Sequence, residues 1–269
     1  MTPHSSSLGG KVVLITGGSS GIGRAAVQAF VDAGARVVFA GRRAQLGQEV
    51  AAAARGAGGD VHYVQADVSL ATDVERLVAH TVATYGRLDA AFNNAATEDG
   101  AFALTADFSE EQFDAAVSAN LKSVWLCMKL EIRQLLAQDP PGGSIVNTSS
   151  VNGLGGAPGG ALYSAAKAGV LALTKSAAQE YATRRIRVNA LVAGAFHTPM
   201  LGRVLDRAGG GTPEGRSAAE AQYAELNPMH RIGEPAEAAA AAVWLCSDAA
   251  SYVTGHSMIV DGGMTASTR

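Results

Sequence analysis

Several features are scarce in this chain of 269 residues, and each scarcity argues against a class of protein. Charged residues make up only 17% of the chain, the net charge is −3 and no basic run occurs, which argues against binding to a nucleic-acid backbone. The most apolar run, residues 238–246, is too short to cross a bilayer. The first residues lack the charged and apolar regions of a signal peptide. We therefore expect a cytoplasmic protein that binds neither nucleic acid nor a membrane.

Cysteines and metal-ligand clusters are scarce too. The two cysteines, Cys127 and Cys246, lie far apart in apolar, helix-like segments, so we expect both to be buried and unpaired. No group of histidines or carboxylates suggests metal ligands, and no metal is expected. Glycine, in contrast, is abundant, with 32 residues, or about 12% of the chain against about 7% in a typical domain. This excess predicts many tight turns or close approaches of backbone to a ligand.

Apolar, β-branched runs alternate with segments of helical spacing along the chain. The runs predict strands at residues 11–16, 36–40, 61–66, 88–93, 144–149, 186–192 and 256–261. The segments between them predict helices that include 23–33, 72–85, 110–136 and 162–181, and Thr72-x-x-Glu75 matches a capping box at one helix start. The alternation predicts an α/β fold of Rossmann type, a doubly wound, mainly parallel seven-stranded sheet with helices on both faces. Neither a repeat nor a linker divides the chain, so we expect one domain over residues 1–269, with a flexible tail at 1–9.

The turn after the first predicted strand, TGGSSGIG, has the composition of a phosphate-binding loop. Gly17, Gly21 and Gly23 would let backbone N–H groups and the next helix N-terminus face an anionic pyrophosphate. The spacing also matches an ATP or GTP P-loop, but Arg24-Ala25 stands where that motif requires Lys-Ser/Thr. We therefore expect a nucleotide site at the carboxyl ends of the strands, with a glycine-rich turn that binds nothing as the alternative.

The segment NTSSVNGLGGAPGGALYSAAKAG, residues 147–169, ends with a tyrosine and a lysine four positions apart. Residues i and i+4 share a helix face, so Lys167 should lie one turn from Tyr163. The pKa of a free tyrosine is near ~10, and a nearby ammonium favours the phenolate. Tyr163 could then take a proton from an alcohol or donate one to a carbonyl. For either residue alone, the alternative is a solvent-facing side chain on an amphipathic helix.

Together these motifs resemble the short-chain dehydrogenase/reductase family, from about Lys11 to Gly263. The segments that carry the resemblance are TGGSSGIG, NNAA at 93–96, NLKSVW at 120–125, the serine before the Tyr-x-x-x-Lys pair, RVNALVAGAFHTPM and YVTGHSMIVDGG. Ala96 and Ala193 replace a glycine and a proline that are usual in the family. Both replacements are small, so they bear on fine substrate preference and not on the reaction class.

The resemblance implies an NAD(P)-dependent oxidoreductase that interconverts a secondary alcohol and a ketone. Tyr163 would be the general acid/base, and Ser150, which fits the spacing better than Ser149, would bind the substrate oxygen. Lys167 would hold the nicotinamide ribose, and Asn120 would position a water. The implied cofactor-binding residues are Gly17, Ser19, Ser20, Gly21, Ile22, Gly23, Arg42, Arg43, Asp67, Val68, Asn94, Ala95, Tyr163, Lys167, Gly194, Phe196 and Thr198.

Alternatives exist for single residues and for the whole protein. Asp67 would contact adenine or only form the turn before a helix. Thr198 would meet the nicotinamide amide or only cap a helix, and we expect His197 to be an exposed loop residue rather than a substrate contact. A cofactor-sensing or scaffold protein on the same fold is one functional alternative, and an epimerase or dehydratase that retains its cofactor is another.

The end of the second predicted strand bears on the choice of cofactor. Gly41-Arg42-Arg43 offers no carboxylate for a ribose 2′-OH, whereas guanidinium groups bind phosphate well. Ser19-Ser20 lacks the extra basic residue of many NADP-binding relatives, and the two arginines could instead form a solvated helix start. We expect NADP(H) in preference to NAD(H), with Arg42 as the main phosphate ligand.

Two expectations concern larger parts of the chain. The long, glycine-rich segment 196–230 predicts a mobile substrate-binding lid. The family resemblance implies a homotetramer in which the helices that begin near Glu110 and Leu162 pack across an interface.

Overall fold

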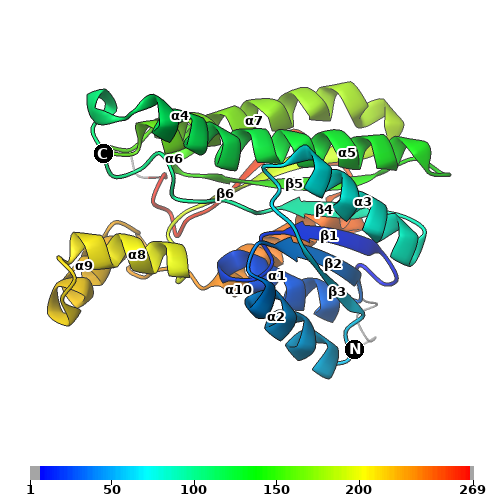
Figure 1. The fold of residues 1–269 in the computed structure, drawn as a ribbon, viewed down its shortest axis with the longest axis horizontal. Coiled ribbons are helices and arrows are strands. Elements are labelled where there is room, and N and C mark those ends of the chain that lie inside the picture. The colour runs from blue at the N-terminus through cyan, green and yellow to red at the C-terminus, as the bar shows by residue number, and fades with distance from the viewer. Residues whose placement is uncertain (1–6, 267–269) are drawn as a thin grey trace.

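A seven-stranded sheet runs through the middle of the molecule, and all of its strand pairs are parallel (Figure 1). The computed structural model describes residues 7–266. The strands are β1 (Val12–Thr16), β2 (Arg36–Gly41), β3 (Val61–Gln65), β4 (Ala90–Asn93), β5 (Gly143–Ser150), β6 (Ile186–Ala193) and β7 (Ser257–Val260). Their order across the sheet is β3-β2-β1-β4-β5-β6-β7, so the winding direction reverses between β1 and β4. In such sheets, ligands bind outside the carboxyl ends of the strands at this reversal.

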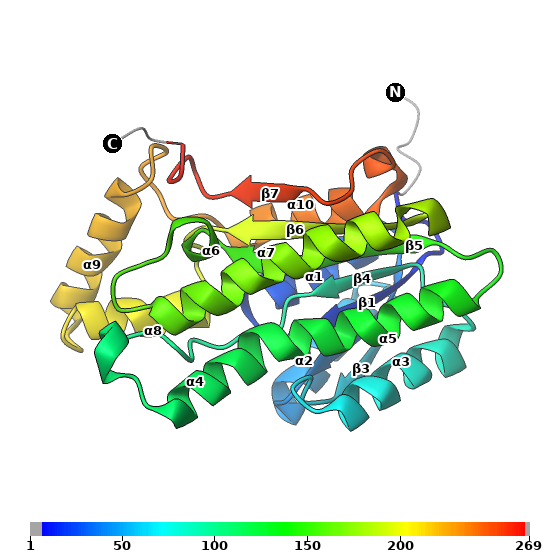
Figure 2. The same ribbon diagram turned by 90° about the horizontal axis from the view of Figure 1, so that it is seen from above.

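Helices cover both faces of the sheet (Figure 1). On one face lie α1 (Gly21–Asp32), α2 (Ala44–Gly56) and α10 (Pro235–Cys246). On the other lie α3 (Ala71–Tyr85), α5 (Ser123–Ala137) and α7 (Ala161–Tyr181), with α4 (Glu110–Val117) just before α5. Three more helices, α6 (Asn152–Gly155), α8 (Pro199–Ala208) and α9 (Pro213–Glu225), follow the carboxyl ends of β5 and β6. Figure 2 shows α8 and α9 beyond the end of the sheet.

The central strands are apolar because both of their faces are covered. All five residues of β1 are buried; Val13 and Ile15 pack toward α1 and α10, whereas Leu14 packs toward α3 and α5. This alternation gives the sheet two separate apolar cores, one on each face. The cysteines are divided between them, Cys127 on the α5 face and Cys246 on the α10 face, and both are buried and unpaired as predicted.

The seven predicted strands are confirmed, but two helical details were wrong. The predicted helix 110–136 consists of α4, a π-helical turn at Ser118–Lys122 and α5. The predicted capping box at Thr72 and Glu75 does not form, because α3 begins one residue earlier and Leu70 occupies its N-cap without a side-chain bond. Instead, Oδ2 of Asp73 accepts a hydrogen bond from the backbone N–H of Asp67 at 2.8 Å. The short motif was compatible with a cap, but Thr72 lies inside the first turn of α3 and not at its N-cap.

Two further observations bear on the sequence-based expectations. Residues 1–6 of the expected N-terminal tail lie outside the described residues, while Leu8 is buried in the core on the face of the sheet that α1, α2 and α10 cover. Over residues 7–266, no helix has both the length and the apolar character needed to span a membrane. Within the same range, no set of three or more histidine, cysteine or carboxylate side chains is arranged to hold a metal ion.

Candidate active site

The loop between β1 and α1 is built for close approach of backbone to an anion. Gly17 has a φ of +70°, and a Cβ atom there would lie 2.8 Å from Cα of Ala95. At Gly23, a Cβ atom would collide with the carbonyl oxygen of Gly17, so the helix can pack on its own loop only without a side chain. Ser20, the N-cap residue of α1, makes no side-chain cap bond, and the first turn carries no acidic residue. The helix N-terminus is therefore free of competing anions, and this cradle fits a pyrophosphate.

Polar side chains at the ends of neighbouring strands join this loop to the next one. Oγ1 of Thr16, at the end of β1, accepts hydrogen bonds from the backbone N–H groups of Asn94 and Ala95, each at 3.1 Å. The Thr148 hydroxyl of β5 donates to Oδ1 of Asn94 at 3.4 Å. Sequence reasoning singled out neither Thr16 nor Thr148 as a site residue. A signal was present for Thr16, because it is the one polar residue of β1 and stands at its end, whereas Thr148 is one of several polar residues in β5.

Lys167 lies underneath Tyr163 in the interior of the protein. Its side chain is only 1% exposed, and Nζ donates to the carbonyl oxygen of Thr148 at 3.0 Å. Nζ lies 5.6 Å from the centroid of the Tyr163 ring. The alternative that Lys167 is a solvated surface charge is therefore wrong. Burial lowers the pKa of Lys167 to about 8, because desolvation disfavours the ammonium.

Burial acts on Tyr163 in the opposite sense. It raises the pKa of Tyr163 to about 12, and the hydrogen-bonding hydroxyl of Ser150 offsets part of that rise. The sequence-based expectation was that the Lys167 ammonium would favour the phenolate. In this structure, desolvation by burial is the largest influence, and it raises the pKa of Tyr163 instead. The Tyr163 hydroxyl therefore keeps its proton at neutral pH.

The two serines at the end of β5, Ser149 and Ser150, make different hydrogen bonds. The Ser149 hydroxyl donates to the carbonyl oxygen of Lys167 at 2.8 Å and so fixes α7 to the sheet. Oγ of Ser150 instead accepts from the backbone N–H of Asn152 at 3.2 Å and lies beside Tyr163. Ser150 is thus the member of the pair that lies with Tyr163.

Asn120 sits in the π-helical turn between α4 and α5 and is fully buried. Its Oδ1 accepts from the backbone N–H of Thr97 at 3.0 Å, and its Nδ2 donates to the carbonyl oxygen of Asp99 at 3.4 Å. The next residue, Gly100, accepts a hydrogen bond from the backbone N–H of Tyr163 at 3.0 Å. One loop, residues 97–100, therefore connects Asn120 to Tyr163. Single π-helical turns within α-helices occur frequently at functional sites.

The residues expected at the adenine end lie around the ends of β2 and β3. Arg43 donates to Oγ of Ser20 in the glycine loop at 2.7 Å. Arg42 is mostly exposed and lies 3.8 Å from the Asp67 carboxylate. Oδ1 of Asp67 accepts from the backbone N–H and the hydroxyl of Ser69, at 3.0 and 2.7 Å, so Asp67 does form the turn that was its alternative role.

Other expected cofactor residues in this region have buried side chains. Val68 packs into the core on the α3 face, and Ser19 is buried where the glycine loop meets β2. Ile22 is partly buried against the core on the α1 face. Their backbone groups, rather than their side chains, lie along the loops at the site.

The segment after β6 closes the other side of the site. Oγ1 of Thr198 accepts from the backbone N–H of Leu201 at 3.2 Å, so Thr198 caps α8. A Cβ atom at Gly21 would lie 3.1 Å from the Thr198 methyl group, which places the start of α8 against the glycine loop. Phe196 is buried in the core, and the backbone N–H of Gly194 bonds to Val260 of β7 at 3.0 Å.

The neighbouring His197 is a partly exposed loop residue, as expected. Its ring nitrogens lie 3.7 Å from Glu220 of α9 and 3.8 Å from Glu234 at the start of α10. The imidazole thus lies between two carboxylates, one on α9 and one at the start of α10.

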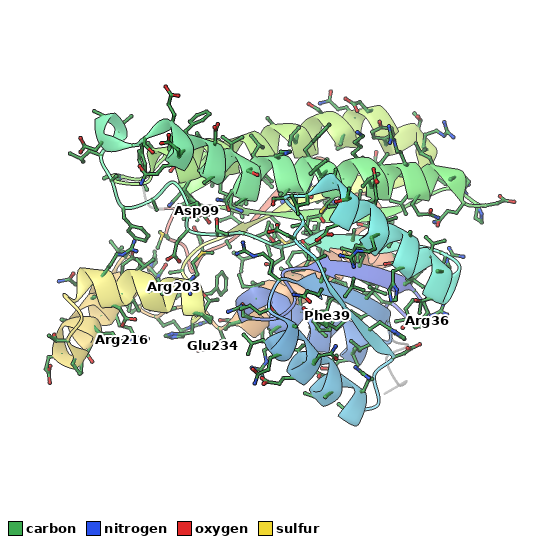
Figure 3. All side chains as sticks on the ribbon, in the orientation of Figure 1. Arg36, Phe39, Asp99, Arg203, Arg216 and Glu234 are labelled. Carbon is green, nitrogen blue, oxygen red and sulfur yellow. The ribbon has the colours of Figure 1, made fainter. Side chains whose placement is uncertain are left out.

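Helix α8 is connected to the loop that holds Asn120. The guanidinium group of Arg203 pairs with the Glu98 carboxylate through bonds as short as 2.7 Å. Arg207, one turn later, lies 4.2 Å above the Phe102 ring. Figure 3, in which Asp99 and Arg203 are labelled, shows this loop and α8 facing one another.

Three comparisons with known proteins cover nearly the whole chain. A family model described as enoyl-(acyl carrier protein) reductase matches residues 17–265. A 2,5-dichloro-2,5-cyclohexadiene-1,4-diol dehydrogenase of Sphingobium indicum is 44% identical over 261 residues, 97% of this chain and 99% of that protein. An A-factor type gamma-butyrolactone 1′-reductase of Streptomyces virginiae is 40% identical over 265 residues, 98% of this chain and 99% of that protein. The crystal structure of levodione reductase matches with a TM-score of 0.90 and 36% identity, covering 96% of this chain and 98% of that one.

Proposed function

Because the chain belongs to the short-chain dehydrogenase/reductase family, we propose that it transfers a hydride between NADP(H) and a secondary alcohol or ketone. The dehydrogenases and reductases that it resembles over nearly their full length support an oxidoreductase acting on CH–OH or C=O groups. The observation that carries the proposal is the buried Lys167, held by the Thr148 carbonyl directly under Tyr163. A buried ammonium is costly, so a chain retains one where its charge is used.

The cofactor would lie along the carboxyl ends of β1, β2 and β4. The glycine loop and the N-terminus of α1 would hold its pyrophosphate, and Asn94 and Ala95 would line the crevice beside it. Arg42 and Arg43 would hold the 2′-phosphate of NADP(H), while Thr198 and the backbone near Gly194 would lie at the nicotinamide end. When bound, the nicotinamide supplies or accepts the hydride.

Tyr163 would move the proton that accompanies the hydride. With a pKa of about 12, its hydroxyl is protonated at neutral pH and can donate to a ketone oxygen as negative charge develops there. The Ser150 hydroxyl would donate a second hydrogen bond to the same oxygen, which stabilises that charge. In alcohol oxidation, Tyr163 would take the proton instead.

Lys167 and Asn120 would return the proton to solvent. The pKa of Lys167, about 8, lies close to neutral pH, so its ammonium group can lose and regain a proton in turnover. Asn120, fixed by the loop at residues 97–100, would position a water between the lysine and the surface.

We propose that residues 196–230, which contain α8 and α9, form the substrate-binding lid. Leu201 and Leu205 of α8 pack with Ala219 of α9 in a small apolar cluster separate from the two main cores. The contacts of Arg203 and Arg207 with the 97–104 loop would hold the lid over Tyr163. A lid with its own small core can move as a unit.

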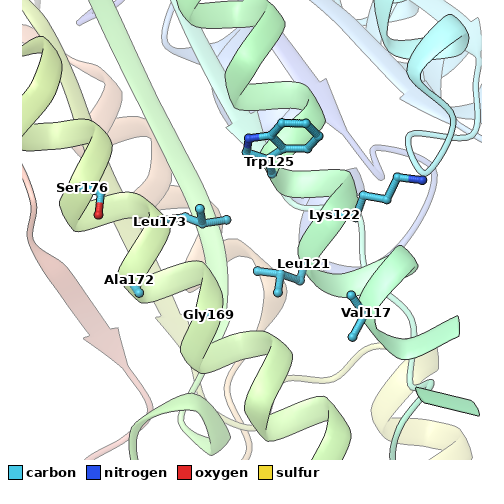
Figure 4. Close-up of a pocket in the computed structure, with 8 residues that line it drawn as sticks. All are labelled: Val117, Leu121, Lys122, Trp125, Gly169, Ala172, Leu173 and Ser176. Carbon is cyan, nitrogen blue, oxygen red and sulfur yellow. The ribbon is translucent and has the colours of Figure 1, made fainter. Parts of the chain in front are cut away.

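A homotetramer is the proposed assembly. A depression of about 440 Å³ lies between α5 and α7 on the outer surface, and it is lined mainly by apolar residues (Figure 4). Leu121, Leu173 and Ala172 form its walls, and Trp125 at its edge is 43% exposed. These are the helices that sequence analysis assigned to an interface, and a second copy of the chain would cover this face.

The reaction is tested by assaying the purified protein with ketones and secondary alcohols, including cyclic diols and lactone ketones, and with both phosphorylated and unphosphorylated cofactors. We expect one mole of nicotinamide cofactor oxidised for each mole of ketone reduced. Turnover of substrate without net cofactor oxidation would instead identify an epimerase or dehydratase. Cofactor binding without turnover of any of these compounds would favour a sensing or scaffold protein.

A further inference from the structure

A buried carboxyl group lies behind the candidate active site, and no proposed catalytic step uses it. Glu131 of α5 is 0% exposed and accepts a hydrogen bond from Asn93, the last residue of β4. None of the lysine, arginine or histidine side chains in residues 7–266 forms an ion pair with it. A buried carboxylate without a cation is so unfavourable that such groups usually take up a proton.

The polar side chains around Glu131 have more buried acceptor atoms than hydrogen-bond donors to satisfy them. Nδ2 of Asn93 donates to Oε2 of Glu131 at 2.9 Å and to Oδ1 of Asn147 at 3.0 Å. Oε1 of Glu131 and Oδ1 of Asn93 are both buried and without a partner, and they belong to two groups already joined by one hydrogen bond. With an ionised Glu131, both atoms are acceptors that lack a donor. A proton on Glu131 supplies the missing donor, because a carboxylic acid and an amide can pair through two hydrogen bonds.

The same network reaches the residue that holds Lys167. Asn93 and Asn147 lie opposite one another in the register of β4 and β5. Nδ2 of Asn147 donates to Oγ1 of Thr174 on α7 at 3.0 Å. The residue after Asn147 is Thr148, whose carbonyl oxygen accepts the hydrogen bond from Lys167. Two side chains, Asn93 and Asn147, therefore connect Glu131 to the part of β5 that holds the proposed catalytic lysine.

The groups around Glu131 favour its neutral form. The titratable groups that interact electrostatically with Glu131 are the thiols of Cys127 on α5 and Cys246 on α10. Burial raises the pKa of both thiols, so they carry no charge at neutral pH. Asn93, Asn147 and Thr174, which reach the network from β4, β5 and α7, are uncharged. Burial raises the pKa of Glu131 itself from 4.5 to about 8, although the hydrogen bond from Asn93 opposes that rise.

We infer that Glu131 is a neutral carboxylic acid in the folded protein, and that its proton completes a two-bond pair with Asn93 that positions the end of β4 and the adjoining part of β5, whose Thr148 carbonyl holds Lys167. Glu131 is thus a positioning residue, and this part of the inference rests on the proposed function. The assignment of a proton to Glu131 does not depend on the proposed function.

The pH dependence follows from proton binding. Between pH 4.5 and about 8, folded Glu131 keeps its proton while the unfolded chain loses it. The stabilisation is fully present below pH 4.5 and is lost progressively as the pH rises to about 8. Across this window, each pH unit lowers the folding equilibrium constant about tenfold relative to a variant with no proton to lose.

Glu131→Gln tests the protonation state, because the glutamine amide supplies the same acceptor and a donor without titrating. Glu75→Gln, at an exposed position on α3, is the matched control. The folding constants of all three proteins are measured by denaturant unfolding from pH 5 to 9. The ratio of the Glu131→Gln constant to the wild-type constant should rise about tenfold per pH unit up to about pH 8 and then level off. The corresponding ratio for Glu75→Gln should stay constant. Infrared spectra at pH 7 should show the C=O stretch of a protonated carboxyl group in wild type that is missing in Glu131→Gln.

Kinetics test the positioning role. We expect Glu131→Gln to keep the wild-type kcat at pH 7, and Glu131→Ala to lower kcat with little change in KM for the cofactor. No protonated-carboxyl band at pH 7, a Glu131→Gln variant that does not fold at pH 7, or one whose stability stays parallel to wild type would overturn the assignment of the proton. An unchanged kcat in Glu131→Ala would overturn the positioning role. The infrared and unfolding results do not depend on activity, so they stand or fall separately from the proposed reaction.

Discussion

Lys167 is a single residue of the candidate site whose buried charge lowers the stability of the fold. Its ammonium group is buried with one backbone acceptor, and burial lowers its pKa from 10.5 to about 8. Between these two values the folded protein releases a proton that the unfolded chain keeps, so the stability contribution of Lys167 increases with pH across this window.

Lys167→Met removes this titration. We expect the free energy of unfolding of wild type, relative to that of the variant, to rise by about 1.4 kcal/mol per pH unit above pH 8. Urea unfolding at pH 7 to 10 measures this difference, with Lys175→Met on the exposed side of the same helix as control. Wild type and Lys167→Met curves that stay parallel across the range would show that the lysine is not desolvated in solution.

Cofactor choice is also decided by single side chains. Arg42 is exposed at the end of β2, whereas the guanidinium group of Arg43 is already bonded to Ser20. We expect Arg42→Ala to weaken NADPH binding by about 1.5–3 kcal/mol, the range for hydrogen bonds to charged groups, and to leave NADH binding nearly unchanged. Fluorescence titration of both variants with both cofactors measures this. Arg43→Ala should weaken binding of both cofactors because it loosens the glycine loop, and that of NADPH more because it also removes a phosphate ligand. Equal losses for the two cofactors in Arg42→Ala, or tighter wild-type binding of NADH, would contradict the assignment.

The residues of the site could be predicted from the sequence, but their pKa values could not. Tyr163 and Lys167 stand in a local motif whose spacing already determines that they share a helix face. The pKa values depend on how completely the surrounding loops exclude water, which is a tertiary property. For the same reason the burial of Glu131 could not be predicted, since nothing local indicates that a glutamate in a helix bonds to the end of a buried strand.

At the scale of elements, the lid depends on side-chain contacts that cross between separate segments. Arg203 of α8 pairs with Glu98, which lies between Thr97 and Asp99, the two loop residues that bond to Asn120. Because Arg203 is half-exposed, this ion pair should contribute only about 0.2–1 kcal/mol.

We therefore expect Arg203→Gln to raise KM for the substrate by no more than about fivefold at low salt, with the difference from wild type shrinking in high salt as the pair is screened. The matched control is Arg216→Gln, which removes the exposed Arg216–Asp206 pair within the lid itself. Steady-state kinetics at two ionic strengths measure KM for the substrate in wild type and in both variants. A larger, salt-independent effect of Arg203→Gln would mean that Arg203 binds the substrate directly.

Helix and strand positions were predicted more accurately than helix ends. Buried strands such as β1 and β4 have an apolar pattern that identifies them without tertiary information. The π-helical turn at Asn120 could not be predicted, because it is accompanied by hydrogen bonds from a loop more than 20 residues earlier. The capping box at Thr72 failed for the related reason that packing set the start of α3 at Ala71.

At the scale of the whole molecule, the proposed tetramer would cover the apolar face of α5 and α7. Trp125→Asp introduces a charge at the edge of the depression without touching the core. Light scattering at micromolar concentration should report a tetramer for wild type and a smaller species for this variant. Leu70→Asp, at an exposed leucine outside this face, should leave the mass unchanged. A monomeric wild type would rule out the proposed assembly.

The central claim is that Tyr163, positioned over Lys167 and beside Ser150, transfers the proton in turnover. Tyr163→Phe removes one hydroxyl and almost no volume, so fold and cofactor binding should survive. The most direct measurement is kcat with a ketone that the wild type reduces, taken with NADPH affinity and thermal unfolding of the same preparations. We predict a loss in kcat of about 10²–10⁴ with cofactor affinity and unfolding temperature unchanged. Near-native turnover by Tyr163→Phe would contradict the proposed mechanism.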